Sequence, residues 1–136
     1  MSWFRIAEAA ALLGVSDDTV RRWGESGRLT IHRDGTRQRI DGRDLVPLLT
    51  EHPARAALAE AFPLARASAR NRFVGLVTRV VVDGVMAQVD VQAGPFRVVS
   101  VMTREAAEEL GLEPGMLASA SVKATTVVVE LPPEAP

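Results

Sequence analysis

The spacing of hydrophobic residues divides the chain into a helical first part and a strand-rich second part. In the first part, apolar side chains recur every three or four positions, which is the period of an amphipathic helix. One helix is predicted from the residues that follow this spacing, Ile6, Ala9, Ala10 and Leu13. Gly14 is expected to end this helix, because glycine readily adopts the left-handed conformation that is common just after a helix.

A second helix and a β-hairpin are expected to follow. Ser16 suits the N-cap of the helix, because its hydroxyl oxygen can accept a hydrogen bond from a free backbone amide. Val20 and Trp23 would form the buried stripe of this helix. Residues 29–40 are then predicted to form two short strands joined by Asp34-Gly35, a pair typical of tight hairpin turns.

A short third helix and a connector complete the first part. Asp41 is expected to cap the helix, and Pro47 should distort or shorten it. The buried face of this helix would consist of Leu45, Leu48 and Leu49. Residues 51–67 are predicted to be a connector, because Pro53 and Pro63 bracket an alanine-rich stretch that can form two or three helical turns.

The second part is rich in valine and broken by turn residues such as Asp83-Gly84. Five strands are predicted, over residues 73–82, 85–91, 96–102, 117–123 and 126–130. A helix over 104–110, ended by Gly111, lies between the third and fourth strands, an order that suggests a small OB-like β-barrel. We therefore expect an α+β chain of two domains, with boundaries at 1–50, 51–67 (connector), 68–131 and 132–136 (frayed tail).

Composition narrows the class of protein. Hydrophobic residues make up 47% and charged residues 24%, values typical of a globular chain. No apolar run is long enough for a membrane span and no signal-peptide pattern is present, so a cytoplasmic protein is expected. There is no cysteine, and His32 and His52 have neither an acidic partner nor metal-ligand spacing, so we expect neither an enzyme nor a metal site.

The distribution of charge favours a polyanion partner for the first part only. The net charge is −1, so any affinity for DNA must come from a local patch. Residues 28–43 carry five arginines against two aspartates. From residue 73 onward, eight acidic residues stand against four basic ones.

The segment from Phe4 to Trp23, FRIAEAAALLGVSDDTVRRW, has small residues in the first helix and Gly-Val-Ser at the turn. It resembles the helix-turn-helix of MerR-like regulators and of related excisionase-type domains. Those folds add a β-hairpin wing, and residues 29–40 occupy its place. The resemblance covers about the first fifty residues and implies a winged helix-turn-helix that binds double-stranded DNA.

DNA contacts are expected from the second helix and from the wing. The N-terminal end of a recognition helix enters the major groove, where arginine can pair with guanine or hold a phosphate. A basic wing suits the DNA backbone or the minor groove. The expected DNA-contacting residues are Ser16, Thr19, Arg21, Arg22, Arg33, Thr36, Arg37 and Arg39.

Four short motifs follow one another in the second part: SARN at 68–71, TRE at 103–105, LGLEPG at 110–115 and VKATTV at 122–127. Together they resemble a Mop domain, also called a molbindin or TOBE domain. The resemblance implies a molybdate or tungstate pocket between two copies of the domain. The ligands that it implies are Ser68, Ala69, Arg70, Thr103, Lys123, Ala124 and Thr125.

The residue types suit a tetrahedral dianion. Such an anion offers only acceptors, and hydroxyls, backbone amides, one guanidinium and one ammonium are all donors. Arg70 and Lys123 would also balance its charge, and Lys123 is the only lysine among sixteen basic residues. Family members often have a serine where this chain has Ala106, so one hydroxyl is missing or is replaced by that of Thr125.

These features predict a molybdate- or tungstate-responsive DNA-binding regulator, assembled through its barrels as a hexamer or, second, a dimer. Communication between the halves is expected to pass through the semi-rigid connector. The alternative is an oligomeric protein that buffers or stores the anion, with a helix-turn-helix that serves only assembly. Nucleic-acid binding by the barrel is disfavoured, because it offers only Phe73 and Phe96 for base stacking and is acidic.

Overall fold

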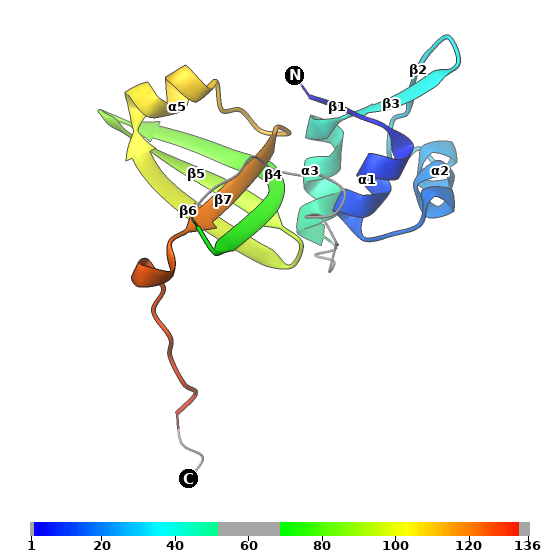
Figure 1. Ribbon diagram of the computed structural model, residues 1–136. Coiled ribbons are helices and arrows are strands. Elements are labelled where there is room, and N and C mark those ends of the chain that lie inside the picture. The colour runs from blue at the N-terminus through cyan, green and yellow to red at the C-terminus, as the bar shows by residue number, and fades with distance from the viewer. Residues whose placement is uncertain (1, 52–68, 134–136) are drawn as a thin grey trace.

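The computed structural model describes residues 2–51 and 69–133, which form a helical part and a curled β-sheet (Figure 1). The helical part confirms the three predicted helices and the hairpin, and adds a short strand at its start. Its elements are β1 (Trp3–Phe4), α1 (Ile6–Leu13), α2 (Asp17–Glu25), β2 (His32–Asp34), β3 (Arg37–Asp41) and α3 (Gly42–Glu51).

The helix ends follow the local sequence signals. Gly14 ends α1 in the left-handed conformation, with φ at 67°, and its amide donates to carbonyls of the last turn. Ser16 caps α2, since its hydroxyl oxygen accepts from the amide of Thr19 at 3.2 Å. Asp41 caps α3 in the same way, accepting from the amide of Arg43 at 3.0 Å. The predicted shortening at Pro47 is wrong, because α3 continues through it to Glu51.

A three-stranded sheet of order β1-β3-β2 forms the wing. The hairpin turn lies at Gly35, whose φ of 63° is the conformation that an Asp-Gly turn supplies. On the other side of β3, Trp3 pairs with Asp41 and Phe4 with Ile40. The start of the chain is thereby fixed against the wing strand, where β3 enters α3.

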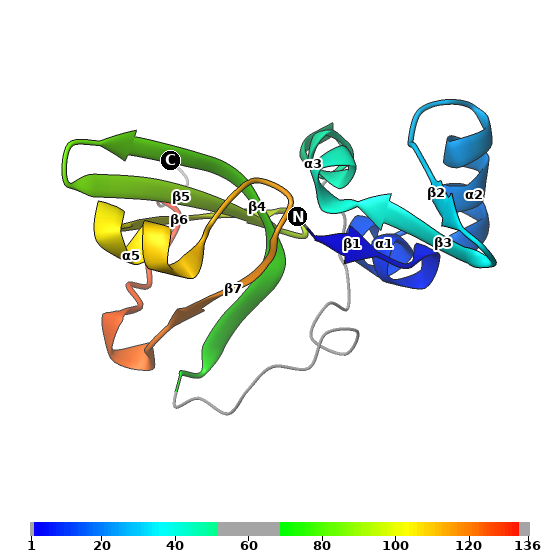
Figure 2. The same ribbon diagram turned by 90° about the horizontal axis from the view of Figure 1, so that it is seen from above.

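The second part is a four-stranded antiparallel sheet of order β6-β5-β4-β7 (Figures 1 and 2). The long strand β4 occupies a central position and is bent, with a register irregularity between Val77 and Arg79. A short helix lies between β6 and β7, as predicted. The elements are β4 (Asn71–Asp83), β5 (Met86–Ala93), β6 (Phe96–Thr103), α5 (Arg104–Leu110), β7 (Leu117–Val122) and the 3₁₀ turn η1 (Ala124–Thr126).

The fold class is confirmed as α+β with two parts, but the sheet is a half-barrel and the fifth predicted strand is wrong. Residues 127–133 follow η1 without strand structure. Val128, Val129 and Leu131 are at least 80% exposed. A strand needs a neighbour to satisfy its backbone groups, and none of the described strands pairs with this segment.

Two buried clusters hold the molecule together. The first gathers the inner faces of α1, α2 and α3 and includes Val74 and Leu76 from β4. The second lies inside the curl of the sheet, where Val77, Val89 and Val91 are covered by partly buried side chains. The first cluster therefore crosses from the helical part into the sheet.

Candidate functional site

The helix α2 presents a basic face because its buried stripe is narrow. Val20 is fully buried, whereas Arg21 and Arg22 are exposed on the other side. Each guanidinium has a local partner: Arg21 donates to Asp18 at 3.3 Å and Arg22 to the hydroxyl of Thr19 at 3.1 Å. These exposed contacts are weak and can open when a phosphate approaches.

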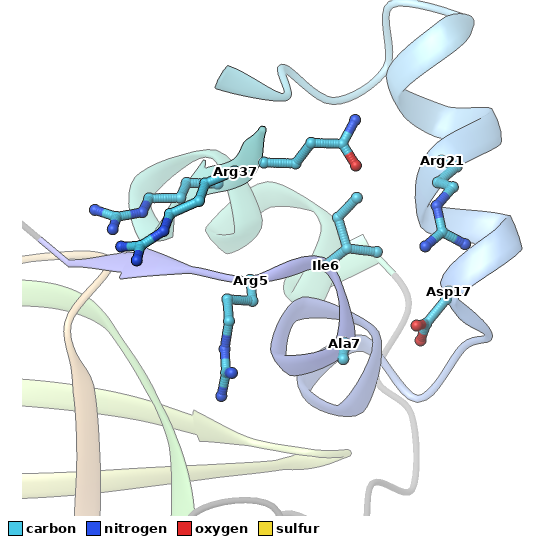
Figure 3. Close-up of a pocket in the computed structure, with 8 residues that line it drawn as sticks. Arg5, Ile6, Ala7, Asp17, Arg21 and Arg37 are labelled. Carbon is cyan, nitrogen blue, oxygen red and sulfur yellow. The ribbon is translucent and has the colours of Figure 1, made fainter. Parts of the chain in front are cut away.

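A groove of about 580 Å³ separates α2 from the wing (Figure 3). We call it the arginine groove. Figure 3 shows Asp17 and Arg21 on the α2 wall, Arg37 from β3 on the other side, and Arg5 and Ile6 between them. Its lining residues are Arg5, Ile6, Ala7, Asp17, Arg21, Arg37, Gln38 and Arg39. Four arginines against one aspartate make this surface suited to a polyanion.

A second hollow of about 280 Å³ continues the arginine groove along α2. Arg21 and Gln38 line both hollows, and Arg33 of the wing lines the second. The structure thus brings four of the expected DNA-contacting residues to one surface: Arg21, Arg33, Arg37 and Arg39. The other four lie beside it, with Ser16 and Thr19 at the start of α2, Arg22 on its exposed face and Thr36 at the tip of the wing.

Sequence reasoning missed Arg5 and Gln38. Arg5 precedes α1 and donates through its amide and its side chain to Glu8, at 2.9 and 3.2 Å. Its place in the groove depends on the pairing of β1 with β3, which joins positions nearly forty residues apart. Gln38 could have been found, because it stands between Arg37 and Arg39 in a hairpin already assigned to DNA.

An ion pair marks the wing root, by which we mean residues 41–43. Asp41 is only 6% exposed, and its carboxylate accepts from the Arg43 amide at 3.0 Å and from Nη2 of Arg43 at 2.6 Å. The hydrogen bonds from the Arg43 side chain lower the pKa of Asp41, although burial acts in the opposite direction. Asp41 is therefore an ionised acceptor that fixes the end of β3 to the start of α3.

Five of the seven expected anion ligands lie at one end of the sheet. Asn71 pairs with Val122 in the register of β4 and β7, and the Asn71 side-chain amide donates to the Val122 carbonyl at 3.1 Å. Arg70 and Lys123 are the next residues along the chain on either side of this pair. Both are exposed, and Ala69 precedes Arg70. Ser68 lies outside the described residues.

The turn after β7 also suits an anion. Lys123 leads into η1, where the amide of Thr126 donates to the Lys123 carbonyl at 3.0 Å. The first amides of a helical turn precede its first internal hydrogen bond, so those of Ala124 and Thr125 remain available as donors. Backbone amides, a hydroxyl and an ammonium thus lie within three consecutive residues.

Thr103 lies at the other end of the sheet. It pairs with Met86, which in turn pairs with Asp83 at the end of β4, whereas Arg70 and Lys123 flank the start of this 13-residue strand. Figure 1 accordingly shows α5 and η1 at opposite ends of the curl. The Thr103 hydroxyl oxygen accepts from the Ala106 amide at 3.1 Å, which leaves its own hydrogen free to donate.

Within residues 2–51 and 69–133, no three His, Asp or Glu side chains are grouped as a metal site would need. None of the helices in this part of the chain is long and apolar enough to cross a membrane.

Comparison with protein families gives two matches. A helix-turn-helix domain matches residues 3–53, and a TOBE domain matches residues 67–129. Comparison with curated proteins gives no match.

Several solved structures are similar to about half of the chain, and three of them are as follows. A molybdate-binding protein from Sporomusa ovata is 30% identical, with a TM-score of 0.47, over 49% of this chain and 100% of its own. MopII from Clostridium pasteurianum is 33% identical, with a TM-score of 0.46, over 48% of this chain and 100% of its own. The cytoplasmic molybdate-binding protein ModG, with molybdate bound, is 38% identical, with a TM-score of 0.46, over 54% of this chain and 51% of its own.

Proposed function

The chain belongs to the TOBE domain family and carries a helix-turn-helix domain ahead of it, and on this premise we propose that it is a DNA-binding regulator responsive to molybdate or tungstate. One observation carries the proposal. A surface suited to a polyanion and a donor set suited to a small dianion occur in the same chain, on different parts of it. Neither matching family is catalytic, which supports a non-enzymatic role, and the similar protein ModG is described as cytoplasmic, which supports the same compartment for this chain.

The DNA-binding part of the proposal rests on the arginine groove. The groove lies between the capped helix α2 and the hairpin wing, and these are the two elements that a winged helix-turn-helix directs at DNA. Arg21 would contact the major groove, while Arg37 and Arg39 would hold the phosphate backbone. The MerR-like subtype remains a prediction from the sequence.

The anion-binding part rests on donor chemistry. Arg70, Lys123 and the amides of η1 are exposed donors at one end of the half-barrel, with no acidic residue among the expected ligands. The similar proteins from Sporomusa ovata and Clostridium pasteurianum match over their whole length, and the first is described as binding molybdate. Tungstate has the same charge and shape, so we extend the proposal to it.

We further propose that each anion lies between two copies of the chain. Arg70 and Lys123 flank the start of β4, whereas Thr103 is paired through β5 with the end of β4, so we expect Thr103 to reach the anion from a second chain. Two chains packed end against end could supply the two parts of the donor set to one anion. A binding site of this kind makes anion occupancy dependent on assembly.

The half-barrel also exposes apolar surface that a second copy of the chain could cover. A hollow of about 300 Å³ opens between β6 and β7, lined by valines of the sheet and by Leu110 and Leu112. Residues 127–131, four of which are apolar, are exposed and have no partner strand in the described structure. Assembly through these barrels, as a hexamer or else a dimer, would cover both.

An anion store would need the barrels but not the arginine groove, which favours the regulator over the storage alternative.

Two measurements on the full chain test this function. Calorimetry with sodium molybdate, tungstate and sulfate is expected to give binding heat for the first two. Fluorescence anisotropy with a labelled random-sequence duplex is expected to show DNA affinity that falls steeply with salt. Absence of heat with both molybdate and tungstate, or DNA affinity too weak to measure even at low salt, would contradict the corresponding half of the proposal.

A further inference from the structure

The helical part and the half-barrel meet at two glycines. Gly42 begins α3 at the wing root, and Gly115 lies in the loop between α5 and β7. A methyl group on Gly42 would overlap the carbonyl oxygen of Gly115. A methyl group on Gly115 would overlap the backbone of Gly42 and Arg43. The two backbones are therefore in direct contact, and neither position has room for a side chain.

The surrounding contacts make this meeting point a packed interface. Leu76 of β4 is fully buried in the same cluster as Leu45 and Leu49 of α3. Leu117, which follows the glycine loop, packs against this cluster. Packed interiors resist small displacements, so a shift on one side of the contact must be taken up on the other.

The loop over residues 111–116, which we call the glycine loop, is fixed at both of its ends. The Leu112 amide donates to the carbonyl of Ala107 in α5 at 3.2 Å. The Gly115 amide donates to the Val77 carbonyl at 2.8 Å, and the Val77 amide donates to Met116 at 2.9 Å. Both views show this loop reaching from the half-barrel toward β1 and α3 (Figures 1 and 2).

Helix α5, which leads into the glycine loop, has Thr103 as its N-cap. α5 has seven residues, so its two ends are only about 10 Å apart at 1.5 Å per residue. Thr103 caps one end through the Ala106 amide, and Gly111 closes the other in the left-handed conformation. A proposed anion ligand thus lies at the start of this short helix, and the glycine loop that contacts the wing root leaves from its end.

We propose that α5 and the glycine loop carry the state of the anion site to the DNA-contacting surface. The inference rests on the proposed function and adds the route of regulation. An anion that engages the Thr103 hydroxyl repositions the start of α5, and the helix transmits this displacement to the glycine loop. Contact of Gly115 with the wing root then moves the end of β3, the strand that carries Arg37 and Arg39 into the arginine groove.

The chain contains its own reporter for this route. Its two tryptophans, Trp3 and Trp23, both lie in the helical part, so their emission reports on that part alone. Trp3 is 40% exposed and pairs with Asp41 of the wing root. Molybdate added to the full chain is expected to change this emission with the midpoint that calorimetry gives, and the change should persist in Trp23→Phe.

Three variants distinguish the loss of the contact between Gly42 and Gly115 from the backbone strain that an alanine can cause elsewhere. Gly42→Ala and Gly115→Ala introduce the overlaps from opposite sides and are expected to abolish the tryptophan response while calorimetric affinity stays within about twofold. Gly35→Ala is the matched control, because it places alanine at a positive φ of 63° with no atom within 4 Å, in the hairpin turn and outside α5 and the glycine loop. It should keep the tryptophan response.

Scanning calorimetry of the unliganded chains should show one unfolding transition in wild type and two in the interface variants.

The outcomes distinguish this inference from the proposed function. Binding heat without a tryptophan response in wild type overturns the route and leaves anion binding intact. A response that survives in both folded interface variants, or two unfolding transitions in wild type, also overturns it. Absence of binding heat overturns the proposed function and, with it, this inference.

Discussion

The basic residues of the arginine groove and those of the proposed anion site differ in whether they have acidic neighbours. In the arginine groove, the exposed side chains of Arg5 and Arg21 have acidic neighbours at 3.2 and 3.3 Å, pairs that contribute little to stability and open readily. Around the anion site, the expected ligands carry no carboxylate, and Lys123 is exposed at the end of β7. Among residues 2–51 and 69–133, no carboxylate forms an ion pair with Lys123, which suits a small dianion that a nearby carboxylate would repel.

Removal of the only lysine tests the anion site. Lys123→Ala is expected to weaken molybdate binding about tenfold to a hundredfold, because a charged donor to the anion is lost. Calorimetry measures the change, and Arg33→Ala, which removes one positive charge from the wing, serves as its control. Equal molybdate affinity in Lys123→Ala and wild type would show that this ammonium is not a ligand.

Removal of one groove arginine tests the DNA surface. Arg37→Ala is expected to weaken binding to a random-sequence duplex and to reduce the slope of log affinity against log salt by about one. The control is Arg104→Ala, which removes the same charge from the half-barrel, where it pairs with Glu108 at 2.8 Å. If both variants lose affinity equally, only the net charge of the chain matters and the groove does not bind DNA.

The sequence predicted site residues where the signal was a local motif. Arg70 and Lys123 were expected as ligands, and the structure brings them to flank one strand pair. The separation of Thr103 from them was not predictable, because it depends on the register of three paired strands. Arg5 was missed for a similar reason, since the other arginines of the groove are distant from it in sequence.

At the scale of elements, the helices were predictable because their caps are local. Ser16, Asp41 and Gly14 act at the ends where the sequence placed them. Strands need partners, and this explains both failures: β1 exists because β3 is beside it, while residues 126–130 have no neighbouring strand in the described part of the chain. Helix α3 passes Pro47 with its apolar face buried, so tertiary packing outweighs the lost hydrogen bond.

Deletion of the exposed C-terminal segment tests assembly. A chain that ends at Thr126 lacks Val127, Val128, Val129 and Leu131, each worth about 1.5–3 kcal/mol if buried by a partner. Light scattering is expected to show an oligomer for the full chain and a monomer for this deletion. The control ends at Leu131 and keeps the apolar residues. An oligomer of unchanged size after the longer deletion would exclude the segment from the interface.

The wing root predicts a pH dependence of stability. The lowered pKa of Asp41 means that its ionised form stabilises the folded chain above the ordinary value of 3.8, and that this contribution is lost as pH falls through the lowered value. Asp41→Asn is expected to cost about 1 kcal/mol at pH 7, from loss of hydrogen bonds to a charged group. Urea unfolding at pH 7 and pH 3.5 should show the difference between the two proteins shrinking at low pH. A difference that is constant or grows would contradict the ion pair as its cause.

At the scale of the whole molecule, two routes could couple the surfaces. The sequence favoured the connector over 51–67, almost all of which lies outside the described residues. The contact of Gly42 with Gly115 provides a second route that sequence patterns cannot reveal, because glycines carry no periodic signal. Replacement of residues 54–62 by a Gly/Ser stretch should reduce the effect of molybdate on DNA affinity if the connector transmits it, and leave that effect unchanged if the glycine loop does.

Both routes serve one claim, that anion binding changes DNA affinity. The most direct test uses a duplex that the full chain itself selects from a random library, so that no operator need be assumed. Its dissociation constant is measured at fixed salt without anion, with saturating molybdate, and with the same concentration of sulfate. Allosteric coupling of ordinary strength predicts that molybdate changes this constant by about fivefold or more, in either direction, and that sulfate does not. An unchanged constant at molybdate concentrations that calorimetry shows to be saturating would contradict the account.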